Sequence, residues 1–207
     1  MAYFFISLVS AYLIGSIPTS YILSRLKGVD IRQHGSGNIG ATNTLRVMGK
    51  GMGVMVLVLD MLKGVICVLL LPKIFFNANA NISIDMFRVF MAGASVFGHI
   101  WTIFLNFKGG KGVATTLGVF LALSPKPAIA AILIWLIVVI LSKYVSLSSI
   151  IMMLAMPAMM LFFAQPVSYA ILGVILCIVI GYTHRQNIDR LFRGTEHKIG
   201  EKIRPKP

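Results

Sequence analysis

The chain has 207 residues, of which 57% are hydrophobic and 12% are charged, and its mean hydropathy is +0.88. Soluble globular domains carry about 25% charged residues, so this composition excludes a protein that hides its apolar surface in one water-soluble core. Lys and Arg outnumber Asp and Glu by 19 to 6, which in a membrane protein indicates topology and attraction to anionic lipid. It does not indicate nucleic-acid binding, because no basic stripe interleaved with exposed aromatic residues is present.

Successive apolar runs predict membrane-spanning helices. A spanning helix needs about 20 apolar residues, so several fit into one membrane-embedded domain over residues 1–207, with no soluble domain. The first run lacks the basic leader and cleavage site of a signal peptide, and we interpret it as a retained span. We therefore expect an all-α polytopic membrane protein of about seven helices, at 2–24, 52–72, 86–106, 113–123, 128–142, 146–163 and 167–182.

Basic residues crowd into alternate joints between these runs, namely 25–51, 107–112, 143–149 and the tail 183–207. The positive-inside rule then predicts an outside amino terminus, a cytoplasmic carboxy terminus and a basic cytoplasmic tail. The opposite side has only Lys73, Arg88 and Lys126, near breakers such as Pro72, the stretch 77–85, Ser124-Pro125 and Gln165-Pro166. The crowded joints and tail hold Arg25, Lys27, Arg32, Arg46, Lys50, Lys108, Lys111, Lys143, Arg185, Arg190, Arg193, Lys198, Lys202, Arg204 and Lys206.

A few polar or reactive side chains lie inside the apolar runs. Asp60 and Lys63, at i and i+3, can neutralise each other, and burying either alone would be costly; we expect an internal salt bridge, with a direct ligand role as the alternative. For His99, a structural histidine bonded to a backbone carbonyl is the simpler interpretation than a catalytic one. Cys67 and Cys177 have no metal-ligand spacing and resemble small buried hydrophobes. We expect no metal site and no cofactor.

The joint after the first run is rich in glycine and hydrogen-bond donors. It contains G-x-G-x-x-G at residues 35–40, but a dinucleotide fold needs a preceding strand in a βαβ unit, and membrane helices flank this joint. The glycines still let backbone N–H groups approach an anion, and the guanidinium of Arg46 suits phosphate. We expect a phosphate-binding loop, with a flexible capped loop as the alternative. Further donors are Ser36, Asn38, Thr42 and Asn43.

A second glycine cluster surrounds Lys111. The segment Phe107-Lys108-Gly109-Gly110-Lys111-Gly112 is only superficially a P-loop, because Gly112 stands where that motif requires a hydroxyl residue. Free N–H groups, the helix dipole and an ammonium nevertheless meet where the next helix begins. We expect an anion site here; a basic turn would explain the lysines but not the glycines.

Two further polar clusters lie at the carboxy-terminal end. The hydroxyls of residues 146–149 fit either helix capping or ligand contact. After the last run, His184 and Asn187 share a helix face at i and i+3. His184 and Asp189 also spell H-x-x-x-x-D, a spacing used by one acyltransferase superfamily, but five residues place side chains about 140° apart on a continuous helix. We therefore do not expect these two to form a catalytic pair.

Taken in order, residues 36–46, residues 98–99 with 107–115, and residues 184–196 resemble the three motifs of the PlsY family, bacterial acyl-phosphate:glycerol-3-phosphate acyltransferases. The resemblance implies a seven-helix enzyme in the bacterial inner membrane with its active site facing the cytoplasm. It would move a fatty acyl chain from acyl phosphate to the 1-hydroxyl of sn-glycerol 3-phosphate, giving lysophosphatidic acid and phosphate. Its partners would be the two substrates, membrane lipid and an acyl-phosphate-forming enzyme; oligomeric state and chain-length preference stay open.

The resemblance also implies residue roles. Lys111 and Arg46 would stabilise charge on the leaving phosphate, and Glu196 would organise the tail. Asp60, Lys63 and His99 would have structural roles. We expect the substrate's own phosphate, rather than His184, to accept the hydroxyl proton. Glycerol phosphate or its hydroxyl would be bound by Ser149, His184 and Asn187, and the acyl-phosphate phosphate by Ser36, Gly37, Asn38, Thr42 and Arg46. Further substrate-binding residues would be Gly40, Gly109, Gly110 and Gly112.

Other classes fit less well. A membrane anion transporter also gathers glycines and cations at helix ends, but it predicts inverted repeats and polar residues in both halves of the pore. A lipid phosphotransferase would need clustered acidic metal ligands, and the chain has only six scattered acidic residues. A purely structural scaffold would leave the glycine and donor clusters unexplained.

Overall fold

The computed structural model describes residues 2–76 and 82–201, and within these residues every regular element is a helix. The terminal basic residues Lys202, Arg204 and Lys206 and most of the breaker stretch 77–85 lie outside the described residues. The chain folds into two compact units, one reaching up to Val119 and the other comprising Phe120–Glu201. The single membrane-embedded domain stays a prediction.

The helices confirm the all-α membrane architecture. Among the described residues, four stretches are long and apolar enough to cross a bilayer, or up to six if two bent helix pairs each form one span. The helix over Val113–Leu123 is shorter than these. The count of seven spans and the outside amino terminus stay predictions. The four stretches are Lys50–Phe75, Ile84–Leu105, Pro125–Ser142 and Val145–Phe162.

The run 2–24 is not one helix, contrary to the prediction. It breaks between Ser16 and Thr19 and bends by 43°, because Pro18 has no N–H to continue the helical hydrogen bonds. The amide of Ile17 instead bonds to the carbonyl of Ile14 at 3.3 Å. The first unit contains α1 (Ala2–Ser16), α2 (Thr19–Arg25), η1 (Ile31–Gln33), α3 (Ala41–Met48), α4 (Lys50–Leu69), α5 (Leu71–Phe75), α6 (Ile84–Ile100), η2 (Ile103–Leu105) and most of α7 (Val113–Leu123).

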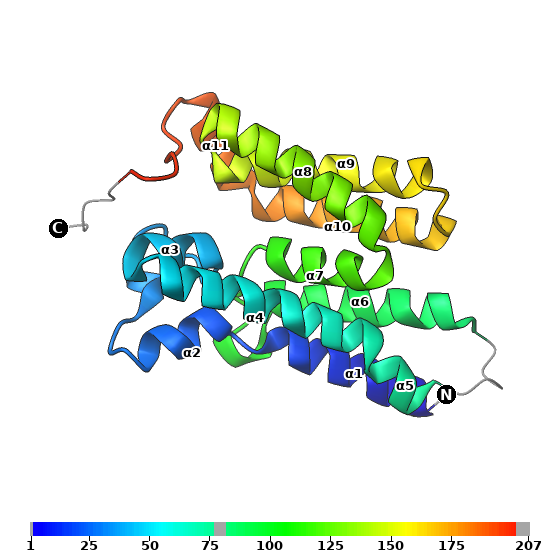
Figure 1. Ribbon diagram of the computed structural model, residues 1–207. Coiled ribbons are helices and arrows are strands. Elements are labelled where there is room, and N and C mark those ends of the chain that lie inside the picture. Colours follow the sequence, from blue (N-terminus) through cyan, green and yellow to red (C-terminus); the bar gives the residue numbers. More distant parts are fainter. Residues whose placement is uncertain (1, 77–81, 202–207) are drawn as a thin grey trace. The chain divides into compact units, whose positions relative to one another are not determined.

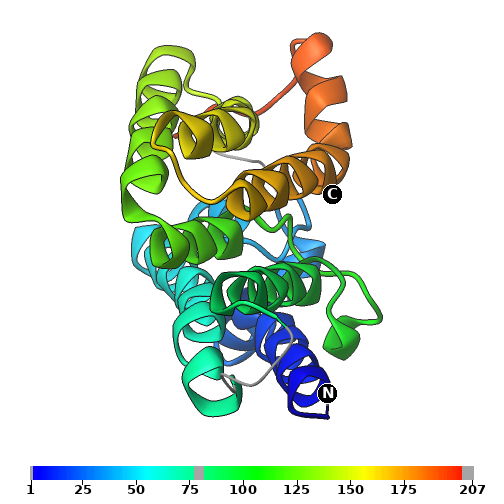
Figure 2. The same cartoon turned by 90° about the vertical axis from the view of Figure 1, so that its right-hand side faces the viewer.

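Small residues bring α1 and α6 together in the first unit. Ser7, Ala11 and Gly15 form one buried stripe of α1, and α1 makes its most extensive contact with α6 (Figures 1 and 2). A Cβ at Gly98 on α6 would overlap the carbonyl oxygen of Tyr12. Such small-residue interfaces are typical of membrane helices, where close packing drives association instead of the hydrophobic effect.

Gly98→Val is therefore expected to separate these helices. Overpacking a close contact costs about 1 to 3 kcal/mol, so the unfolding midpoint in detergent should fall by several degrees. Gly181→Ala is the matched control, because a Cβ at Gly181 on α10 meets nothing within 4 Å. An equal loss of stability in both variants would contradict the close-packing explanation.

The second unit is a bundle of three long helices with a short fourth one. α8 packs against α9, and α9 against α10. α11 leaves α10 at an angle of 62° and lies at the end of the unit where α8 gives way to α9 (Figure 1). The helices are α8 (Pro125–Ser142), α9 (Val145–Phe162), α10 (Val167–Thr183) and α11 (Arg185–Phe192).

Candidate functional site

The loop between α2 and α3 begins with a tightly held acidic turn. Asp30 accepts a hydrogen bond from the backbone N–H of Arg32, and the guanidinium of Arg32 binds the same carboxylate at 2.9 and 2.7 Å. The Arg32 guanidinium lowers the pKa of Asp30 to about 2, and the carboxylate in turn raises the pKa of Arg32. Arg32 also lies over the ring of Tyr21, 4.6 Å from its centroid. Arg32 thus anchors the loop, and its charge is already matched.

Asn43 organises the predicted phosphate-binding loop from within. Its side chain is buried, accepts a hydrogen bond from the backbone N–H of Ser36 at 2.9 Å, and donates to the carbonyls of Ile31 and His34. The N–H of Gly37 also donates to the carbonyl of His34, with the glycine at φ +72°. The sequence indicated Asn43 as one of several loop donors; the structure shows a side chain that fixes the loop's shape.

The remaining residues of this motif line the start of α3. Gly40 is the residue before the helix, and its carbonyl accepts from the amides of Asn43 and Thr44. The hydroxyl of Thr44 is 2.7 Å from that of Ser20, which ties α3 to α2. The side chains of the other site residues are exposed or half-buried: Ser36, Asn38, Thr42 and Arg46.

The glycines before Lys111 have a packing role that the sequence did not reveal. The N–H of Gly109 donates to the carbonyl of Ile100 at 2.9 Å, and that of Gly110 to the carbonyl of His99 at 3.0 Å. A Cβ at Gly109 would overlap both carbonyls, and one at Gly110 would overlap Nε2 of His99. These two N–H groups therefore hold the loop against the end of α6. The N–H groups in the first turn of α7, which follows Gly112 at φ +90°, have no acceptor within their own helix, as at the start of any helix.

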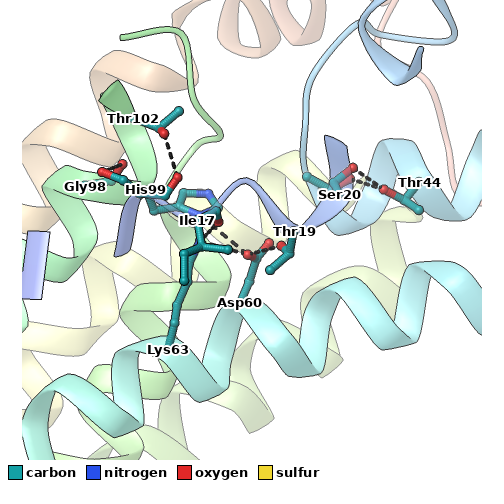
Figure 3. A network of polar contacts seen from close by, with 11 residues as sticks. Ile17, Thr19, Ser20, Thr44, Asp60, Lys63, Gly98, His99 and Thr102 are labelled. Carbon is teal, nitrogen blue, oxygen red and sulfur yellow. Dashed lines mark hydrogen bonds and ion pairs between the residues drawn. The ribbon is translucent and has the colours of Figure 1, made fainter. Parts of the chain in front are cut away.

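Asp60 and Lys63 form the predicted internal salt bridge, and it is part of a larger network (Figure 3). Lys63 Nζ lies 2.9 Å from Asp60 Oδ1, and both side chains are almost fully buried. The hydroxyl of Thr19 donates to the same carboxylate oxygen at 2.5 Å, and Lys63 donates to the carbonyl of Ile17 at 3.2 Å. His99 Nδ1 lies 3.7 Å from Asp60 Oδ1. The carboxylate thus connects α4 with the α1–α2 break and with α6.

In the second unit, Glu196 collects three donors. Oε1 accepts from Asn187 at 2.6 Å and from Ser146 at 2.8 Å, and Oε2 accepts from Arg190 at 2.7 Å. Burial of Glu196 acts to raise its pKa, but these hydrogen bonds outweigh it and lower the pKa below its ordinary value. The carboxylate joins α9, α11 and the tail, which agrees with its expected organising role. Ser146 from the hydroxyl-rich joint and Arg190 from the third motif complete this cluster.

His184 occupies the break between α10 and α11. Its Nδ1 lies 2.8 Å from the carbonyl of Ile180, and because a carbonyl oxygen only accepts, Nδ1 is the donor in this contact. Ser149 donates to the carbonyl of Val145 at 2.8 Å and accepts from Trp135 at 3.3 Å. Its hydroxyl therefore has two partners within its own unit.

Asp189 does not serve His184. Its carboxylate is exposed and binds the guanidinium of Arg193 at 3.0 Å, which excludes the H-x-x-x-x-D arrangement, as expected. Cys67 and Cys177 are free thiols. In the described part of the chain no group of three His, Cys, Asp or Glu could hold a metal ion.

The predicted site residues thus form two groups. Ser36, Arg46 and Lys111 lie in the first unit, at the end where α2 and α3 join its longer helices and where the α6–α7 loop leaves α6 (Figure 1). His184, Asn187 and Ser149 lie in the second unit, around the α8–α9 joint and the α10–α11 break.

Comparison with known proteins gives a consistent result. The family described as glycerol-3-phosphate acyltransferase matches residues 5–194. The chain is 46% identical to glycerol-3-phosphate acyltransferase 2 of Moorella thermoacetica, over 95% of this chain and 98% of that protein. It is 43% identical to the glycerol-3-phosphate acyltransferase of Aquifex aeolicus, over 91% of this chain and 95% of the relative.

Solved structures agree. Crystal structures of PlsY (YgiH), an integral membrane glycerol 3-phosphate acyltransferase, superpose with TM-scores of 0.87 for the glycerol 3-phosphate form and 0.85 for the lysophosphatidic acid form. Both are 41% identical in sequence and cover 95% of this chain; this chain covers 96% and 95% of theirs. The chain belongs to the PlsY family of integral membrane glycerol-3-phosphate acyltransferases.

Proposed function

We propose that this enzyme acylates the 1-hydroxyl of sn-glycerol 3-phosphate with a fatty acyl group taken from acyl phosphate. One observation carries the proposal: the structural likeness extends over 95% of the chain to PlsY in forms with glycerol 3-phosphate and with lysophosphatidic acid. These two compounds are an acyl acceptor and its acylated product. A transporter would require neither the order of the three motifs nor such a product complex.

In the proposed step, the hydroxyl oxygen of glycerol 3-phosphate attacks the acyl carbonyl carbon. A new C–O ester bond forms, the bond between the acyl carbon and the phosphate oxygen breaks, and inorganic phosphate leaves with the bonding electron pair. The hydroxyl proton passes to a substrate phosphate oxygen. Because a mixed anhydride already has a good leaving group, positioning and charge stabilisation can supply most of the catalysis.

The first unit supplies the residues proposed for acyl phosphate. The loop between α2 and α3, which Asn43 holds in shape, would present Ser36, Gly37 and Asn38. Helix α3 would contribute Thr42 and Arg46. Lys111 and the N–H groups at the start of α7 would face the leaving phosphate. Gly109 and Gly110 would act through close packing, since their N–H groups already donate to α6 carbonyls.

The second unit supplies the residues proposed for glycerol 3-phosphate. His184 would contribute its imidazole, and Asn187, whose side-chain amide donates to Glu196, would contribute that amide. Ser149 would contribute the second lone pair of its hydroxyl.

The charge distribution supports the proposed orientation in the membrane, and the resemblance to the bacterial family supports the proposed location. The enzyme would lie in the bacterial inner membrane with its site at the cytoplasmic leaflet. Within each unit, the basic joints lie at one end of the helices (Figure 1), which supports a cytoplasmic location for that end of the unit. An acyl-phosphate-forming enzyme would supply the acyl donor, and membrane lipid would surround the acyl chain.

Phosphate release from palmitoyl phosphate by the protein purified in detergent tests this function. We expect release to depend on glycerol 3-phosphate and to match lysophosphatidic acid formation one to one. Equal activity with acyl-CoA alone, or none with acyl phosphate, would overturn the assignment of the donor.

His184→Gln separates histidine from substrate phosphate as the proton acceptor. If the substrate phosphate accepts the proton, the variant should keep measurable turnover, reduced about 10- to 100-fold through weaker positioning, with a raised KM for glycerol 3-phosphate. Steady-state kinetics together with calorimetric binding of glycerol 3-phosphate would decide. Abolished turnover with normal binding would instead favour His184 as the base.

A further inference from the structure

The polar network on α4 holds the segments that lead into both glycine loops. Lys63 binds the carbonyl of Ile17 and Asp60 binds the hydroxyl of Thr19, so the pair grips both sides of Pro18 at the α1–α2 break. A neutral apolar contact would hold these segments more cheaply, because burying an ion pair costs desolvation, above all in a bilayer. Oδ2 of Asp60 moreover has no hydrogen-bond partner among the described residues. Stability alone therefore does not account for the pair.

The network reaches the second glycine loop through His99. The Nδ1 edge of the ring faces Asp60 Oδ1 at 3.7 Å, an electrostatic contact longer than a hydrogen bond. The opposite edge, Nε2, lies so close to Gly110 that a Cβ there would overlap it. His99 is itself 6% exposed, so the ring fills the space between the carboxylate and the loop.

The chain after Gly110 is held from its other side as well. A Cβ at Gly64, one turn after Asp60 on α4, would overlap the carbonyl of Thr115, and one at Gly118 would overlap that of Met61. α4 is therefore in close contact with α7, while His99 supports Gly110. Lys111 lies between these two fixed points.

We propose that Asp60 and His99 are positioning residues, and that Asp60 acts through the imidazole on Gly110 to fix Lys111 for charge stabilisation. This inference deepens the proposed function and rests on it. The imidazole acts as a spacer: the carboxylate holds one edge, and the other edge sets how closely the loop approaches α6. A displacement of about 1 Å at a reacting group can cost on the order of 100-fold in rate, so the loop requires such support.

A double-mutant cycle tests the chain of contacts. His99→Ala and Asp60→Asn should each lower kcat about 10- to 100-fold, and Gly110→Ala about 100-fold. The KM values should change less than about threefold, since Lys111 acts in the transition state. The combinations H99A/G110A and D60N/H99A should each be about as active as H99A alone. A methyl group at position 110 is harmless once the ring is gone, and without the ring Asp60 has no contact through which to act on Gly110.

Cys67→Ala is the matched control, a buried small residue one turn after Lys63 on the same helix, whose thiol donates to the carbonyl of Ala11. Its kcat should stay within about twofold of the parent. Unfolding midpoints and elution profiles in detergent accompany every variant. Where H99A does not give monodisperse protein, H99N and H99N/G110A decide in the same way, because Asn keeps a donor but lacks the ring edge.

Multiplicative effects in the double variants, or kcat within about threefold of the parent in both H99A and D60N, would overturn this inference. A parent without glycerol 3-phosphate-dependent phosphate release would overturn the proposed function and this inference with it. An active parent with independent effects would overturn this inference alone.

Discussion

Lys111→Gln is expected to lower kcat on the order of 10²- to 10³-fold, the effect of removing one group that stabilises developing transition-state charge. The glutamine keeps a donor and much of the side-chain length but no charge. The KM for acyl phosphate should change far less than kcat, because the charge on the phosphate grows as it leaves. Phosphate release under saturating substrates measures the loss.

Lys108→Gln provides the control for net charge. Lys108 lies three residues earlier in the same loop, and its side chain is exposed. Its replacement should leave kcat within about twofold. If both variants lost the same activity, a general electrostatic attraction of anionic substrate to the loop would replace the proposed local role of Lys111.

Glu196→Gln is expected to abolish most activity and to lower stability, because one carboxylate serves Asn187, Ser146 and Arg190. The glutamine NH2 group can only donate, so at least one of these three donors would lose its acceptor. Hydrogen bonds to charged groups contribute about 1.5 to 3 kcal/mol each, so the unfolding midpoint should fall by several degrees. Asp189→Asn, an exposed carboxylate on the same short helix as Arg190, should change neither quantity appreciably.

The stability difference should depend on pH with a defined sign. Since the folded-state pKa of Glu196 is lowered, its carboxylate stabilises the protein fully above the ordinary value of about 4.3. This contribution is lost as the pH falls through the folded-state pKa. The midpoints of parent and E196Q should therefore converge on acidification below about pH 4. A constant difference down to pH 3 would show that Glu196 acts through packing alone.

The sequence by itself determined the membrane class, the all-helical architecture and the family. An apolar run long enough to cross a bilayer has few alternatives to a helix, because every backbone polar group there must form its hydrogen bonds within the protein. The Asp60–Lys63 pair was also predictable, because i and i+3 residues meet on any helix. Glu196 was expected to organise the tail from its position in the third motif.

Only the tertiary structure decided what the loop residues touch. In the sequence, Gly109 and Gly110 suggest anion binding, yet their N–H groups donate to carbonyls of α6. Because neither residue has a Cβ, the loop can lie directly against His99 and Ile100. Asn43 shapes its loop from inside, and Ser146 and Arg190 join Glu196 across 50 and 6 residues. Such contacts depend on how segments distant in the sequence pack together. That packing is decided by how the side chains fit where two segments meet, which the local residue pattern does not show.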